Sequence, residues 1–104
     1  MRRVPERSLL RIRARLLDPD DVPTVPTTLR YRLDCQTTGT ELIGWTVVSP
    51  VDLLEVAVSA DMNRIINTRN RTERKVFTVE ANAGTDEAYS TEEVYEVRNL
   101  TAVT

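Results

Sequence analysis

The sequence of 104 residues predicts a single all-β domain, an antiparallel β-sandwich. Three features indicate this class. Apolar and polar residues alternate in several short runs, which is the pattern of strands with one buried face. Valine, leucine, isoleucine and threonine are frequent and there are only three glycines, which favours strands. The runs follow one another at short spacing with polar loops between them, and none is joined to the next by the helix that parallel strands need.

The N-terminal third is predicted to contain an arm, a basic strand and a connector. Residues 1–7 lack periodicity and contain Pro5, so we expect an extended basic arm ahead of a sandwich domain that spans residues 8–104. Residues 8–17 alternate arginine with apolar side chains and predict a strand with a basic outer face. Residues 18–26 hold three prolines and three aspartates, a composition that suits turns rather than a strand.

Residues 27–48 are expected to form a central hairpin. The first strand, residues 27–36, places Leu29, Tyr31, Leu33 and Cys35 on its inner face. A turn at residues 37–40 contains Gly39, and the second strand covers residues 41–48. Strict alternation places Ile43, Trp45 and Val47 on one side, so Trp45 is expected to pack in the core or at its edge. Gly44 beside it suggests a bulge or a close approach of another backbone segment.

The second half of the chain predicts three more strands. These cover residues 52–60, 74–82 and 91–100, and the polar segment 61–73 lies between the first two. A short helical turn is possible in that segment, with Ile65 or Ile66 closing one open end of the sandwich. The predicted core is Leu29, Tyr31, Leu33, Trp45, Val56, Val58, Phe77, Val79, Tyr95 and Val97.

Six strands in this arrangement predict an antiparallel immunoglobulin-like β-sandwich with an extended basic N-terminal arm. The likeness concerns architecture only, because the single cysteine, Cys35, cannot form the disulfide of antibody domains. Cys35 is expected to be a small core residue.

The charges are distributed unevenly along the chain. The first 17 residues carry a net charge of about +5, and the segment from Phe77 to the end carries about −5. These blocks could be two solvated strand faces. They could also be complementary surfaces that meet when copies of the chain or neighbouring proteins pack together. Under the second interpretation the partner-binding residues are Arg2, Arg3, Arg7, Arg11, Arg13 and Arg15.

The residue types argue against an enzyme. There is no histidine, one cysteine cannot build a zinc site, and no glycine-rich phosphate loop is present, so we expect no catalytic residues, no cofactor and no metal. The cluster Asp18, Asp20 and Asp21 could be imagined to bind calcium, but a solvated turn is the better interpretation. The pairs at residues 86–87 and 92–93 are expected to be surface acids.

Composition also bears on partners and location. No apolar run is long enough to cross a membrane and no signal peptide is recognised, so we expect the chain to be made and folded in a cytosol and to contact no membrane. Nucleic acid is the weaker choice of partner for the basic segment, because the whole chain is slightly acidic.

Several strand motifs together resemble a known group of proteins. They are PTTLRYRLD at residues 26–34, TGT at 38–40, GWT at 44–46, ERKVFTV at 73–79 and YEVRNL at 95–100. In these motifs the chain resembles small proteins, of about this length, encoded among the structural genes of tailed bacteriophages. Those proteins look like immunoglobulin- or fibronectin-type β-sandwiches. The likeness extends from about residue 11 to residue 100, and YEVRNL is its most distinctive part.

The resemblance implies a structural role in the virion, with no catalytic residues to transfer. The expected protein is an accessory component, a head decoration or cement protein or a part of the head–neck region, made in the host bacterial cytoplasm. Its expected partners are capsid, portal, neck or tail proteins and copies of itself in a symmetric assembly. The alternative is a tail-associated or host-surface carbohydrate-binding module, which requires an exposed aromatic platform. The five aromatic residues considered for that platform are Tyr31, Trp45, Phe77, Tyr89 and Tyr95. Four of the five are predicted to face inward.

Overall fold

The protein is all-β, as the alternation predicts. The structure, a computed structural model, describes residues 1–100. These residues form seven strands and one turn of 3-10 helix, η1 (Asp61–Asn63). The strands are β1 (Arg2–Pro5), β2 (Leu10–Arg15), β3 (Leu29–Cys35), β4 (Thr40–Val48), β5 (Leu53–Val58), β6 (Thr72–Ala81) and β7 (Tyr89–Arg98).

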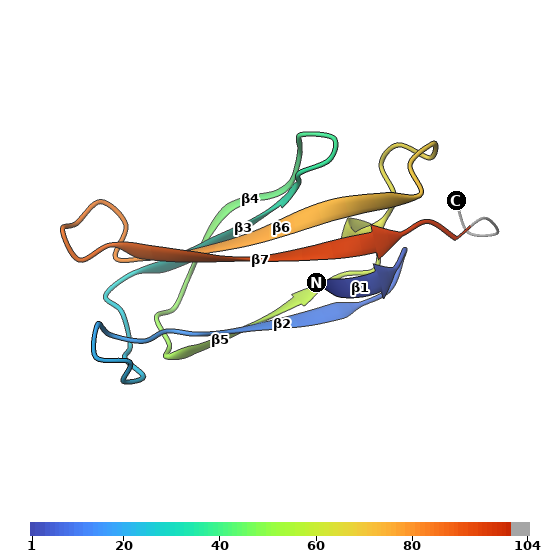
Figure 1. Ribbon diagram of the computed structural model, residues 1–104. Coiled ribbons are helices and arrows are strands. Elements are labelled where there is room, and N and C mark those ends of the chain that lie inside the picture. The colour runs from blue at the N-terminus through green and yellow to red at the C-terminus, as the bar shows by residue number, and fades with distance from the viewer. Residues whose placement is uncertain (101–104) are drawn as a thin grey trace.

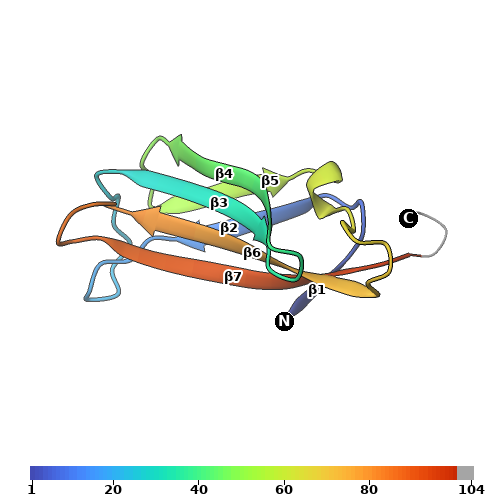
Figure 2. The same cartoon turned by 90° about the horizontal axis from the view of Figure 1, so that it is seen from above.

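The strands lie in two layers of unequal size (Figures 1 and 2). The larger sheet has the order β1-β7-β6-β3-β4, and the smaller sheet consists of β2 and β5. Four of the five strand pairs are antiparallel, but β1 pairs with β7 in parallel, so the larger sheet is mixed and the expectation of a purely antiparallel structure is wrong at this edge. Parallel neighbours cannot be joined by a tight hairpin. Here the chain continues from β1 into β2 of the smaller sheet and reaches β7 only at its end, so β1 and β7 can run in the same direction.

The predicted N-terminal arm is instead an edge strand. Val4 pairs with Val97 and is only 6% exposed, while the backbone N–H of Glu6 donates to the carbonyl of Arg98 at 2.9 Å. Pro5 is tolerated because an edge strand leaves one row of backbone groups unpaired. Sequence periodicity missed this strand because four residues with one inward side chain show no alternation.

The core lies between the two layers. Ile12 and Val58 of the smaller sheet pack against Leu33, Phe77 and other inward residues of the larger one. Tyr31 is half-buried and stacks on Phe77 with ring centroids 5.4 Å apart. Of the predicted core residues, all but Trp45 are buried or pack against the core. Cys35 is buried as expected, and so is Ile65, in the segment between β5 and β6.

Trp45 lies on the outer face of the larger sheet, and the prediction that it packs in the core is wrong. The register explains why: Tyr31 pairs with Thr46 whereas Leu33 pairs with Ile43, so β4 contains one extra residue between these pairs. That bulge reverses the alternation and leaves Trp45 40% exposed. An irregularity at Gly44 was predicted, and a Cβ there would meet only the flexible end of the exposed Glu41 side chain.

The molecule is elongated, with principal extents of 46 × 21 × 21 Å. Strands β6 and β7, each of ten residues, run along its length (Figure 1). Within residues 1–100, no helix has the length and apolarity required to span a membrane.

Candidate docking surfaces

The six arginines predicted to bind a partner do not form one surface. Arg2 and Arg3 lie on β1, at the edge of the larger sheet, whereas Arg11, Arg13 and Arg15 lie on the exposed face of β2 in the smaller sheet. Arg7 is exposed in the turn between these strands, with a φ of 55°. Their docking role stays a prediction.

The charge blocks at the two ends of the sequence meet within one molecule. Strand β1 is basic and lies beside the acidic strand β7, so Arg2 pairs with Glu93 at 3.4 Å and Arg3 with Glu96 at 3.6 Å. Part of the positive charge of the N-terminal block is therefore paired with negative charge of the C-terminal block within the same molecule. On β2, Arg13 pairs with Glu55 at 3.4 Å.

A polar, arginine-rich hollow lies at the end of the molecule where β1 and β7 finish and β6 begins. Its volume is about 690 Å³. We call it the arginine hollow. Arg3 also makes the Glu96 ion pair, whereas Arg69, Arg71 and Arg98 make no ion pair with any residue in the range 1–100. The arginine hollow is lined by Arg3, Thr68, Arg69, Asn70, Arg71, Thr72, Glu96, Arg98 and Asn99.

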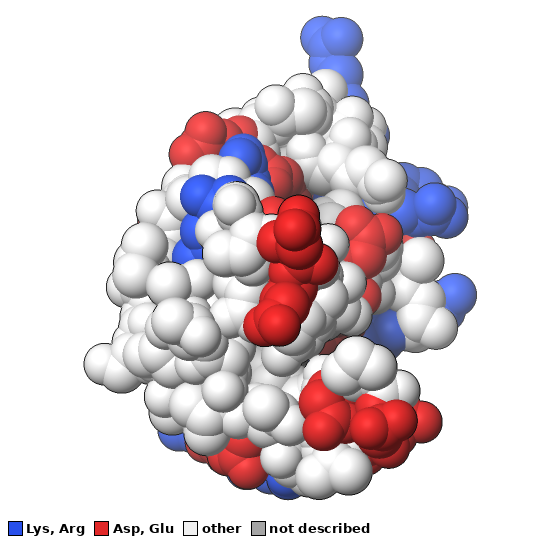
Figure 3. Space-filling view, turned by 90° about the vertical axis from the view of Figure 1, so that its left-hand side faces the viewer, with Lys and Arg blue, Asp and Glu red and all other residues white. Residues whose placement is uncertain are grey.

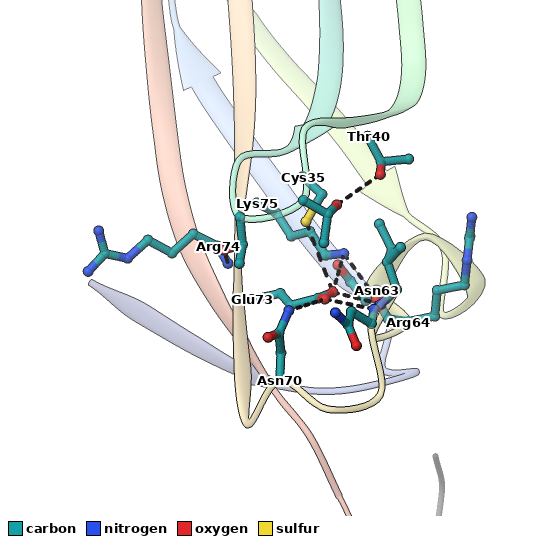
Figure 4. Close-up of polar contacts among 12 residues, drawn as sticks. Cys35, Thr40, Asn63, Arg64, Asn70, Glu73, Arg74 and Lys75 are labelled. Carbon is teal, nitrogen blue, oxygen red and sulfur yellow. Dashed lines mark hydrogen bonds and ion pairs between the residues drawn. The ribbon is translucent and has the colours of Figure 1, made fainter.

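The loop that carries Arg69 and Arg71 is fastened by a buried carboxylate. Glu73 follows it at the start of β6 and is 1% exposed. One of its oxygens accepts the N–H of Ile66 at 2.7 Å, and the other accepts the N–H of Asn67 at 2.9 Å and the side-chain amide of Asn70 at 3.0 Å. Figure 4 shows these contacts converging on Glu73. These hydrogen bonds hold the polar loop between Ile66 and Glu73 in one conformation.

Lys75 completes this buried network from two residues further along β6. Its Nζ donates to the carbonyl of Arg64 at 3.0 Å and lies 3.6 Å from the Glu73 carboxylate (Figure 4). Burial raises the pKa of Glu73, but the hydrogen bonds from the loop and the Lys75 charge outweigh it, so the pKa is lowered overall. Burial lowers the pKa of Lys75, and the Glu73 charge opposes this shift without cancelling it.

The far side of the loop is fastened to the end of β7. The N–H of Asn99 donates to the carbonyl of Arg71 at 2.8 Å, and its side-chain amide donates to the carbonyls of Thr68 and Asn70 at 3.1 and 2.9 Å. The loop therefore bridges β6 and β7, and its arginines project from a supported backbone.

A second buried contact fixes the turn between β1 and β2. The hydroxyl of Tyr95 donates to Asn63 Oδ1 at 2.7 Å, and the Asn63 amide donates to the carbonyl of Ser8 at 2.8 Å. Burial raises the pKa of Tyr95, with a smaller effect from the Glu93 charge. The position of β1, and with it Arg3, is thus tied to the core.

The opposite end of the molecule is acidic. It is formed by the connector at residues 16–28 and the β6–β7 loop at residues 82–88, neither of which contains a lysine or arginine. The two segments lie together, because Asn82 Oδ1 accepts the N–H of Thr27 at 2.8 Å and both line one hollow. Figure 3 looks onto this end and shows acidic side chains facing the viewer. The acidic residues of these segments, which we call the acidic end, are Asp18, Asp20, Asp21, Asp86 and Glu87.

Asp18 supports the backbone of the connector. Its Oδ1 accepts the N–H groups of Asp20 and Val22, both at 2.9 Å, as in the aspartate turns that stabilise loops. This arrangement agrees with the solvated turn expected from the sequence. Among residues 1–100, no three or more histidine, cysteine, aspartate or glutamate side chains gather as a metal site would require.

Trp45 forms a third exposed feature, near the free edge of β4. The guanidinium of Arg30 lies 4.1 Å from the centre of its ring and that of Arg32 lies 5.5 Å away. Arg30 is held by Glu80, and Arg32 pairs with Asp34 at 2.7 Å. Val47 beside it is 77% exposed.

Sequence reasoning identified one of the four arginines of the hollow, Arg3. It treated residues 61–73 as a polar segment and assigned Arg98 to the strand at residues 91–100 without giving it a role. The signal that was available is the density of arginine around Asn70, at positions 69, 71 and 74.

Comparison with protein-family models, with curated proteins and with solved structures found no match to this chain.

Proposed function

We propose that the chain is an accessory structural protein of a tailed-phage virion, a head decoration or cement protein or a head–neck component. It acts by docking on neighbouring virion proteins, not by catalysing a reaction. The strand motifs at residues 26–34 and 95–100 support the class of particle through their resemblance to phage structural proteins. The arginine hollow, rigidly mounted at one end of an elongated body, is the observation that supports docking.

The proposed fold within this role is an immunoglobulin-like sandwich. Strand order supports it: β7-β6-β3-β4 follows the order of the G, F, C and C′ strands of a variable-type domain, and β2-β5 follows the B and E strands. A rigid block of this kind is suited to carry docking groups at its ends.

The proposed mechanism is recognition of carboxylates by arginine. The planar guanidinium binds a carboxylate through two parallel hydrogen bonds, and it is favoured over lysine at interfaces. Arginine supplies 13 of the 14 basic residues of the chain. Exposed ion pairs are individually weak, so stable attachment depends on repetition of the contact around a symmetric particle.

Incorporation into particles tests this function. The chain, carrying an affinity tag, is produced together with the proteins encoded by its neighbouring genes, and particles are purified on a density gradient. We expect the tagged chain to co-sediment with particles and the double variant Arg69→Glu/Arg71→Glu to be depleted from them. Absence of the wild-type chain from the particles, or neighbouring genes that encode no capsid, portal or tail protein, would contradict the proposal.

Carbohydrate binding by a tail-associated or host-surface module is the second candidate, because Trp45 is exposed. The position of Arg30 over the ring counts against it, since a sugar stacking on that face would have to displace the guanidinium. Binding to a glycan array that disappears in Trp45→Ala, with stability retained, would favour this second candidate.

A further inference from the structure

The molecule has opposite charges at its two ends. Strands β6 and β7 run the length of the body, from the arginine hollow at one end to the acidic end at the other (Figure 1). At about 3.3 Å per residue, ten residues separate the two charged ends by roughly 30 Å. Opposite charges so far apart on one rigid body cannot reach each other within the molecule.

The arginine hollow has unsatisfied capacity for anions. Arg69, Arg71 and Arg98 are exposed and unpaired within the described part of the chain, and Glu96 is engaged by Arg3. Two carboxylates of the acidic end, those of Asp86 and Glu87, make no ion pair with any residue of the described range 1–100. Asp86 and Glu87 are exposed in the β6–β7 loop, where the Glu87 carbonyl accepts the side-chain amide of Asn82 at 3.4 Å and the Glu87 N–H donates to Thr85 Oγ1 at 3.2 Å.

We propose that the arginine hollow binds the acidic end of a second copy of this chain, so that copies associate head to tail. The tip of the β6–β7 loop enters the hollow, and the guanidinium groups of Arg69, Arg71 and Arg98 bind the carboxylates of Asp86 and Glu87. The inference deepens the proposed function, on which it rests, by naming the partner of the docking site.

Size and charge favour a second copy as the occupant. A hollow of about 690 Å³ lies in the range of sites that hold small ligands, so it has room for the tip of a loop. The complementary acidic loop is present on the same chain at the opposite end. Such an interface joins two different surfaces, so it propagates along a line unless the rotation between copies closes a ring.

The contact is expected to be weak when only two copies meet. Exposed ion pairs contribute little individually and are screened by salt, so we expect a dissociation constant of about 1 mM at low ionic strength. On a particle, where copies are held at high local concentration, the same contact becomes effective.

Small-angle X-ray scattering and sedimentation velocity of the purified chain measure this association. At millimolar concentration in about 20 mM salt, we expect the mean mass to rise with concentration and the longest dimension to reach about twice the 46 Å of one molecule. In about 0.5 M salt the chain should be monomeric. A side-by-side dimer would raise the mass without this lengthening and would overturn the proposal.

Charge reversal at each end gives the sharper test. Arg69→Glu/Arg71→Glu and Asp86→Arg/Glu87→Arg should each remain monomeric alone. In the first variant the reversed hollow repels the carboxylates of Asp86 and Glu87, and in the second the reversed loop tip repels Arg69, Arg71 and Arg98. Mixed together they should associate again, since the unaltered hollow of one variant meets the unaltered acidic loop of the other, and the two reversed ends also complement each other. The control is Arg11→Glu/Arg15→Glu, which makes the same change in net charge as the first variant, on exposed residues that line neither end.

The outcomes separate this inference from the proposed function. A wild-type chain that stays monomeric at low salt yet enters particles would overturn head-to-tail association and retain the virion role. Salt-sensitive association restored by mixing, with no entry into particles, would retain the inference and overturn the virion role. Loss of association in the Arg11→Glu/Arg15→Glu control, with the hollow variant unaffected, would assign the contact to β2 and overturn the inference.

Discussion

At the scale of single residues, the buried charges of Glu73 and Lys75 are the feature that needs the most compensation by other interactions. Removing two charges from water is costly and is tolerated only where hydrogen bonds replace hydration. Glu73 receives three N–H groups from the loop at residues 66–70, and Lys75 donates to the carbonyl of Arg64, which precedes that loop. Because the two charges can be buried only while these hydrogen bonds are made, the pair holds the loop that carries Arg69 and Arg71 in a fixed position.

Substituting Glu73→Gln should destabilise the fold. The amide retains the shape but removes the charge that compensates Lys75, so we expect a loss of about 3–5 kcal/mol in the free energy of unfolding. Urea denaturation measures this loss. The matched control is Glu92→Gln, an exposed carboxylate on β7, which should change the free energy by less than about 0.5 kcal/mol. Similar small effects for both variants would show that the buried pair is not stabilising the loop.

The pKa of Glu73 also predicts an acid dependence. Because folding lowers this pKa, the ionised group contributes its full stability above the unfolded pKa of about 4.3, and the contribution is lost as pH falls through the lower folded value. The difference in unfolding free energy between wild type and Glu73→Gln should therefore be constant from pH 7 to about pH 5 and shrink below that. A difference that grew on acidification would contradict the direction of the shift.

Trp45 should contribute much less to stability than a core aromatic residue. It is 40% exposed and its main contact is with Arg30, so Trp45→Ala is expected to cost about 1 kcal/mol. Phe77→Ala serves as the comparison, because Phe77 is 1% exposed and its removal should cost about 3–5 kcal/mol. Equal losses in urea denaturation would indicate that Trp45 packs like a core residue.

At the scale of elements, the edge strand β1 determines how the two ends of the sequence meet. It adds a parallel strand to β7, places Val4 against the core and brings Arg2 and Arg3 beside Glu93 and Glu96. The same pairing carries Arg3 to the rim of the arginine hollow. An extended arm would have left these charges free for a partner.

Shortening Val4 distinguishes a strand from an arm. Because Val4 is buried, Val4→Ala should lower the free energy of unfolding by about 1–3 kcal/mol, and deletion of residues 1–7 should lower it further. Arg3→Ala is the control, since its side chain is 79% exposed and its ion pair is screened by water. A truncated chain with unchanged melting temperature would support the arm predicted from the sequence.

At the scale of the whole molecule, apolar burial governs folding and exposed charge governs association between molecules. Apolar burial between the two sheets stabilises the fold and is insensitive to salt screening. The charges at the ends are exposed, so they govern association.

Salt should therefore separate folding from assembly. Raising sodium chloride from about 20 mM to about 0.5 M is expected to abolish the association while moving the melting temperature of the monomer by less than about 4 °C. Differential scanning fluorimetry at low protein concentration measures the second quantity. A large fall in melting temperature would indicate that the exposed ion pairs, such as Arg2–Glu93, stabilise the fold itself.

The sequence alone determined the all-β class and the approximate limits of six strands, and nine of the ten residues that it assigned to the core are buried or pack against it. Alternation is a local property, so Leu33, Phe77 and Tyr95 could be assigned to the inner face without knowledge of their neighbours. The bulge at Gly44 was anticipated, but its consequence for Trp45 was not, because the side of a strand after a bulge depends on the register with the next strand. Only the tertiary structure decided that residues 2–5 join β7, that the charge blocks partly neutralise each other, and that Arg3, Arg69, Arg71 and Arg98 surround one hollow. These residues are up to 95 positions apart in the sequence, and their proximity follows from strand order, which no local pattern records.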